Sequence, residues 1–206
     1  FEQIDKLNGK MGHGVLRYSR NPIACAIDLN HGGRSTRNLL DFGPDVPIYS
    51  NVESAMSAGG EVLILGMAPS GGLLPPEMVE EVDRAVSAGM SVINGLHEQL
   101  GPRYPNLPEG QWIWDIRQEP KDLGIAWARA AKLSNRRALL VGTDMAVGKM
   151  TAGLEIWHAA LRDDVRADFL ATGQIGILVS GKGVPLDAIR VDYACGAIEK
   201  MVLEAA

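Results

Sequence analysis

The stretch Gly142-Thr143-Asp144-Met145-Ala146-Val147-Gly148-Lys149-Met150-Thr151 decides the fold. It follows the apolar run 138–141 and precedes a helical pattern. A strand, a glycine-rich turn and a lysine at a helix start form the order found in phosphate-binding loops. The helix N-terminus supplies roughly half a positive charge and Lys149 a full one. We therefore predict that these ten residues bind phosphate; the alternative is an ordinary glycine-rich turn with an exposed lysine.

The loop departs from the common phosphate-loop pattern at two positions. Five residues, not four, separate Gly142 from Gly148, and Met150 replaces the Ser or Thr that ligates Mg²⁺. Thr151 carries a hydroxyl, but one step along a helix rotates a side chain by ~100°. Thr143 or Asp144 could compensate. We therefore expect no metal ligands here and favour a loop that anchors phosphates over one that hydrolyses them.

The composition limits the classes of protein to which this chain can belong. The 206 residues are 46% hydrophobic and 22% charged, which is ordinary globular usage. The net charge of −5 argues against a nucleic-acid-binding surface. Cys25 and Cys195 lie far apart and form no CxxC pair, so we expect neither a disulfide framework nor a zinc site. We therefore expect the protein to be located in the cytoplasm. No apolar run approaches ~18 residues, so we expect no membrane span.

The order of the elements predicts an α/β protein. Short apolar runs separated by helical patterns are typical of parallel strands with helix crossovers. We place one domain at residues 1–120, a connection at 121–136 and a phosphate-loop domain at 137–206. The strands expected in the first domain are 22–27, 61–66, 91–93 and 111–115, with a helix over 76–88. The second domain should contain strand 138–141, helix 149–161, strand 167–171, a glycine-rich region 173–183 and helix 192–204.

The second domain has fewer strands than a phosphate-loop sheet needs. Only two or three strand patterns follow residue 137, and no further acidic strand end is visible after Gln174. We therefore expect the chain to represent part of a longer protein, truncated at its C-terminus.

Polar side chains follow the expected strands of the first domain. The loops 28–36, 67–74 and 94–101 should meet at one sheet edge, where ligands bind in open α/β sheets. Among their side chains, which include His31, Arg34, Ser70, His97 and Glu98, His97 is the best candidate, although a purely structural histidine fits equally well.

Three further residues are candidate substrate ligands. Asp115 and Arg117 flank the end of the fourth expected strand, and an arginine can hold a carboxylate through two parallel hydrogen bonds. The alternative is a surface ion pair between the two. Gln174 follows the expected strand 167–171, where its side chain either faces the ligand of the phosphate loop or lies incidentally in a glycine turn.

The chain resembles known proteins in two respects. The five-residue spacing of the loop resembles that of dethiobiotin synthetase, although a Thr follows the lysine there. A fuller resemblance, over nearly the whole chain, is to a bacterial and archaeal family that includes D-glutamate N-acetyltransferases. That family also has Met after the lysine. The motifs that carry the resemblance are residues 14–18, 66–72, 91–100, 113–117, 148–151, 171–177 and 183–187.

The resemblance implies a Rossmann-like N-terminal domain followed by a P-loop NTPase-like domain. It also implies acetyl transfer from acetyl-CoA, as donor, to the amino group of D-glutamate, a small-molecule amino-acid substrate. Arg117 would then hold a substrate carboxylate, and His97 or Asp144 would be the general base. The alternatives are an ATP- and Mg²⁺-dependent ligase or kinase and a non-catalytic nucleotide-binding protein. We expect a symmetric homo-oligomer, the common state of soluble proteins.

Overall fold

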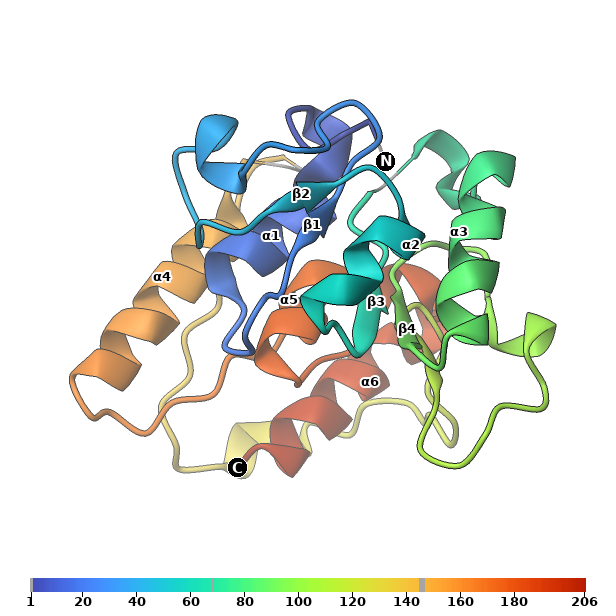
Figure 1. Cartoon of the computed structure of the whole chain (residues 1–206). Coiled ribbons are helices and arrows are strands. Elements are labelled where there is room, and N and C mark those ends of the chain that lie inside the picture. The colour runs from blue at the N-terminus through green and yellow to red at the C-terminus, as the bar shows by residue number, and fades with distance from the viewer. Residues whose placement is uncertain (1, 68, 145–146) are drawn as a thin grey trace. The chain divides into compact units, whose positions relative to one another are not determined.

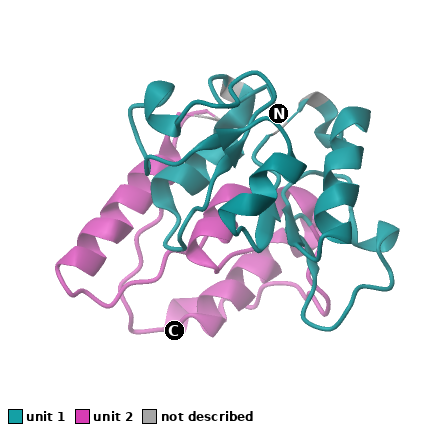
Figure 2. Cartoon of the chain, in the orientation of Figure 1, with its two compact units in different colours: residues 1–117 teal, residues 118–206 magenta. Residues whose placement is uncertain are grey.

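The computed structural model of the protein describes residues 2–67, 69–144 and 147–206. The chain divides into two compact units, Phe1–Arg117 and Gln118–Ala206 (Figure 2). Met145 and Ala146, which we predicted to bind phosphate, lie outside the described residues.

A parallel three-stranded sheet forms the centre of unit 1 (Figure 1). Val92 of the middle strand lies opposite Leu63 on one side and Ile113 on the other. This pairing confirms the predicted parallel arrangement for three of the four expected strands. The strands, in the order β3-β4-β5, are Val62–Ile64, Ser91–Asn94 and Ile113–Asp115.

Helix α3, Pro76–Ser87, connects β3 to β4 and covers the sheet core. Pro75 and Pro76 begin it where a missing N–H costs little. Its buried face includes Val82 and Ala85, both fully buried, and burying a side chain such as Val82 contributes about 1.5–3 kcal/mol. One buried hydrophobic cluster of this unit contains Leu65, Met67, Leu74, Met78, Val82, Val92, Leu96 and Leu100.

Helix α1, Lys10–Tyr18, follows the 3-10 turn η1, Leu7–Gly9, and meets the end of β3 backbone to backbone. The Gly12 N–H donates to the Gly66 carbonyl at 2.7 Å. A Cβ on Gly12 would lie 3.3 Å from that oxygen, and one on Gly66 would lie 3.1 Å from Gly12 Cα. Two glycines are therefore what allow α1 to sit directly beside the carboxyl end of β3.

The expected strand 22–27 is largely wrong. Only β1, Ala26–Ile27, forms, and it pairs with β2, Ile48–Tyr49, in a separate two-stranded parallel sheet. We did not predict β2, which has only two residues and directly follows Pro47. Three short helical elements complete this region: η2 Thr36–Asn38, α2 Val52–Ala55 and η3 Met56–Ala58.

Asp28, at the end of β1, holds the segment that leads into α1. Its carboxylate is fully buried and accepts hydrogen bonds from the N–H groups of Gln3 (2.9 Å), Ile4 (3.1 Å) and Asn30 (3.2 Å) and from His31 Nδ1 (2.7 Å). Burial alone would raise the pKa of Asp28, but the hydrogen bonds from His31 and from the Ile4 and Asn30 backbones outweigh it and lower that pKa. His31 is thus bound to a structural carboxylate.

Unit 2 contains three α-helices, α4 Lys149–Arg162, α5 Gln174–Ser180 and α6 Val191–Glu204, and the 3-10 turns η6 Arg129–Lys132 and η7 Leu186–Ala188 among its described residues. The predicted helices 149–161 and 192–204 are confirmed within one residue at each end. Helix α5 lies in the region that we expected to be only glycine-rich. One hydrophobic core cluster of unit 2 contains Val184, Ile189, Ala197 and Met201.

The two strands expected in unit 2 are wrong. No strand is formed by the described residues of this unit, and one isolated parallel bridge joins Ala171 to Gly183. Leu139 and Val141, expected in a buried strand, are 86% and 77% exposed. A strand is stable only when a neighbour pairs its N–H and C=O groups, and the described part of unit 2 offers residues 138–141 no such neighbour.

The segment 121–136, expected as a connection, packs onto α6 of unit 2. The buried Glu199 carboxylate of α6 accepts hydrogen bonds from the N–H of Trp127 at 2.9 Å and from Arg129 Nε at 3.1 Å. The Trp127 hydrogen bond is the largest cause of the lowered pKa of Glu199. Gly196 lets the chain approach closely, since a Cβ there would lie 1.7 Å from the Gly124 oxygen. Among the described residues, no helix is long and apolar enough to cross a membrane.

Replacing Asp28 by Asn should lower the free energy of unfolding at pH 7 by about 1–3 kcal/mol, because an amide would face N–H donors in a buried site. Since the fold lowers the pKa of Asp28, its stabilisation is present above about pH 4 and is lost as the pH falls through the lowered pKa. Urea unfolding of wild type and Asp28→Asn, at pH 7 and again below the lowered pKa of Asp28, measures the difference in unfolding free energy between the two proteins. Equal losses of stability on acidification in the two proteins would contradict this role.

Candidate functional site

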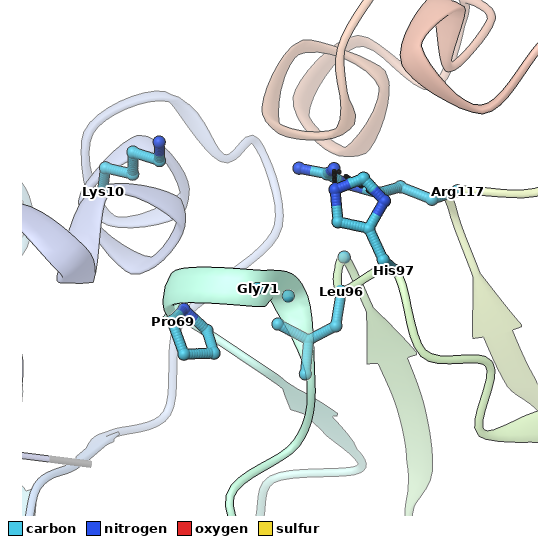
Figure 3. A pocket seen from close by; sticks show the side chains of 8 residues that line it. Lys10, Pro69, Gly71, Leu96, His97 and Arg117 are labelled. Atoms are coloured by element: carbon cyan, nitrogen blue, oxygen red, sulfur yellow. Dashed lines mark hydrogen bonds between the residues drawn. The ribbon is translucent and has the colours of Figure 1, made fainter.

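A pocket of about 240 Å³ opens at the carboxyl ends of β3, β4 and β5 in unit 1 (Figure 3). Ligands bind at this edge in open parallel sheets. None of the residues described around it is acidic, although the chain as a whole has a net charge of −5. The pocket therefore suits an anion. Its lining residues are Lys10, Pro69, Gly71, Gly72, Gly95, Leu96, His97 and Arg117.

His97 and Arg117 meet inside this pocket, as Figure 3 shows. His97 lies three residues beyond β4, and Arg117 lies two residues beyond β5. Arg117 Nη1 donates to His97 Nε2, which assigns the ring proton to Nδ1. The structure thus brings together the two residues that we predicted on different loops, a guanidinium able to hold a carboxylate and an imidazole able to take a proton.

The backbone of Gly72 forms the platform on which the His97 ring lies. Gly72 belongs to the turn η4, Ser70–Gly72, has a φ of +66°, and accepts a hydrogen bond from the His97 N–H at 3.0 Å. A Cβ at Gly72 would lie 2.4 Å from His97 Cδ2. Only glycine fits here, because it tolerates the left-handed backbone and leaves room for the ring.

Asp115 stabilises the loop that carries His97. Its buried carboxylate accepts hydrogen bonds from Asn94 Nδ2 (2.7 Å) and from the N–H groups of Leu100 (2.9 Å) and Gly101 (2.8 Å). Gly101 begins the turn η5, Gly101–Arg103. Asp115 therefore fixes the loop that carries His97, which is a positioning role; its predicted contact with substrate remains a prediction.

Lys10 contributes the second cation of the pocket and was missed by the sequence analysis. It is the first residue of α1, where a positive charge opposes the helix dipole. Its side chain is exposed, and among the described residues no acidic group pairs with it. The available signal was the pattern Gly9-Lys10-Met11-Gly12, in which glycines bring a lysine-bearing helix close to another backbone.

The predicted phosphate loop lies in unit 2 and leads into α4. Gly148 has a φ of +92° and Lys149 is the first helical residue, as a phosphate loop requires. Lys149 Nζ donates to the Asp144 carbonyl, which folds its side chain back over the loop. Met150 and Thr151 occupy the first turn of α4, while Gly142, Thr143, Asp144, Val147 and Gly148 are exposed.

Gln174 is the first residue of α5 rather than a residue beyond a strand end. Its predicted contact with the ligand of the loop remains a prediction. Among the described residues, no group of three or more His, Cys, Asp or Glu side chains is arranged to hold a metal ion.

Comparison with known families matches both parts of the chain. Residues 29–119 match the "Domain of unknown function (DUF1611_N) Rossmann-like domain", and residues 124–206 match the "Domain of unknown function (DUF1611_C) P-loop domain". The crystal structure of a DUF1611 family protein from Anabaena variabilis ATCC 29413 is 45% identical and superimposes with a TM-score of 0.92, covering 98% of this chain and 60% of that one. The predicted Rossmann-like and P-loop α/β fold class is confirmed.

Two curated relatives carry the name D-glutamate N-acetyltransferase. One, from Pseudoalteromonas sp, is 34% identical over 205 residues, which are 97% of this chain and 58% of the relative. The other, from Tritonibacter scottomollicae, is 35% identical over 153 residues, which are 72% of this chain and 45% of the relative. The chain thus spans about half the length of the curated relatives it matches.

Replacing Gly72 by Ala should displace the His97 ring, because the new Cβ would overlap it. Gly71→Ala is the matched control, since Gly71 also has a positive φ, +81°, but a Cβ there meets nothing within 4 Å. Both variants should lose roughly 1–2 kcal/mol of stability to backbone strain. Only Gly72→Ala should shift the imidazole NMR signals of His97. Equal shifts in both variants would show that the ring does not depend on this contact.

Proposed function

Because this chain belongs to the DUF1611 family of Rossmann-like and P-loop domains, we propose that it is an N-acetyltransferase that moves the acetyl group of acetyl-CoA to the amino group of D-glutamate. The observation that carries the proposal is the pocket in which Arg117 meets His97 and whose described lining residues include two cations and no acid. The names of the two curated relatives support the reaction and the acceptor.

The phosphate loop is the proposed anchor of the donor. Coenzyme A carries phosphate groups at the end remote from its thioester, so phosphate binding and chemistry can be separated. Lys149 and the N–H groups at the start of α4 would neutralise these phosphates. Met150 is no obstacle to this role, because an anchored phosphate needs no metal ligand from the helix start.

The unit 1 pocket is the proposed place of the amino acid. Its volume of about 240 Å³ is below the ~300 Å³ at which pockets for drug-sized ligands begin, so it suits a small metabolite better than a coenzyme. Arg117 presents a planar fork that can hold a carboxylate through two hydrogen bonds. The carboxylate next to the amino group of the acceptor is the natural partner for this fork.

Proton transfer gives His97 its proposed role. The amine must lose a proton as its nitrogen attacks the thioester carbon, the C–S bond breaks, and the coenzyme leaves as a thiolate that takes up a proton. His97 Nε2 accepts from Arg117 in the structure. A carboxylate that draws Arg117 to itself would free this lone pair, so binding of the acceptor would prepare the base. Asp144, which lies in the proposed phosphate loop, is the alternative base.

The five-residue spacing of the loop favours one rival, an ATP-dependent ligase or kinase. Such an enzyme needs Mg²⁺ and releases ADP or phosphate, whereas acetyl transfer needs neither. Dependence on Mg²⁺ therefore distinguishes the two reactions.

Thiol release from acetyl-CoA should occur with D-glutamate, in the presence of a chelator, and should be much slower with L-glutamate. Lys149→Ala should raise KM for acetyl-CoA roughly 10- to 100-fold, the effect of losing a charge-assisted hydrogen bond of about 1.5–3 kcal/mol. Lys121→Ala, an exposed lysine outside the loop, is the control and should leave KM unchanged. No thiol release by wild type with any amino acid would overturn the proposal.

A further inference from the structure

We infer that the unit 1 pocket is a dicarboxylate site, in which Lys10 binds the distal carboxylate of the acceptor and sets the preference for an acidic amino acid. The identity of the ligand as an amino acid whose amino group reacts rests on the proposed function. The carboxylate site itself rests on the geometry of Lys10, Arg117 and the glycine loops around them.

The two cations reach into the pocket from opposite sides. Figure 3 shows Lys10 on its helix across the pocket from His97 and Arg117, with the turn that contains Gly71 between them. A single carboxylate needs only one of these cations. Two cations that face one small space, with no acid among its described lining residues, match a ligand with a negative charge at each end.

The position of Lys10 is built into the fold rather than left to a flexible surface. The contact of Gly12 with Gly66 at 2.7 Å fixes α1 against the end of β3, and Lys10 lies half a turn before Gly12. The entry to α1 is held by the Asp28 carboxylate through the N–H groups of Gln3 and Ile4. A lysine at the start of a helix costs stability, typically ~0.3–1 kcal/mol, so helix formation does not account for it.

The neighbours of each cation decide which carboxylate it binds. Arg117 contacts His97, and the proton to be removed lies on the amino group beside the α-carboxylate. The α-carboxylate therefore belongs on Arg117, which leaves the amino group near His97. The side-chain carboxylate then extends across the pocket to Lys10, a point charge that suits a single flexible carboxylate.

The binding test uses glutarate, which keeps two carboxylates but has no amino group to react. Wild type should bind glutarate more tightly than it binds butyrate, measured by titration calorimetry without acetyl-CoA. Lys10→Met should weaken glutarate binding roughly 10- to 100-fold and leave butyrate binding unchanged. Lys10→Arg should restore most of the affinity. Lys6→Met, which removes an exposed lysine outside the pocket, is the matched control.

The kinetic test compares D-glutamate with D-glutamine, which lacks the distal charge. Lys10→Met should reduce kcat/KM for D-glutamate roughly 10- to 100-fold relative to that for D-glutamine, whereas Lys6→Met should not change the ratio. Glutarate binding that is weak in wild type, or equal in wild type and Lys10→Met, would overturn the inference. Lys10-dependent glutarate binding without any thiol release would overturn the proposed reaction and leave the dicarboxylate site standing.

Discussion

The carboxylate of Asp115 is the interaction on which the unit 1 site depends. It is buried at the end of β5 and accepts hydrogen bonds from the Asn94 side chain and from the N–H groups of Leu100 and Gly101. Each buried donor left without an acceptor would cost about 1–3 kcal/mol, so the loop between these residues has one strongly preferred path. That path places His97 at the same sheet edge as Arg117.

Glycine supplies the second constraint, because it sets how closely backbones approach around the pocket. Gly72 makes room for the His97 ring, and the Gly12–Gly66 contact brings α1 to the end of β3. The chain has 24 glycines, and at these three positions the glycine shapes the pocket and its surroundings rather than a simple turn. The cationic side chains act only because these contacts place them.

Local patterns predicted the long helices α3, α4 and α6 and the three strands β3, β4 and β5, but they failed for the strands expected in unit 2. The proline start and the apolar spacing of α3 are properties of a short segment, so its bounds could be read from sequence. A strand depends on a partner elsewhere in the chain, which is why 138–141 looked like a strand yet is exposed and unpaired by any described strand. His97 and Arg117 were predictable as residues beyond strand ends. Lys10 was not, since its place depends on the contact between Gly12 and Gly66.

The most direct test of the account is a crystal structure of the protein with bound D-glutamate and no acetyl-CoA. The account predicts the α-carboxylate in two hydrogen bonds with Arg117, the side-chain carboxylate on Lys10, and His97 Nε2 released from Arg117 toward the amino group. D-glutamate bound elsewhere, or bound here with neither carboxylate on Arg117 or Lys10, would contradict the central claim that this pocket holds the acceptor.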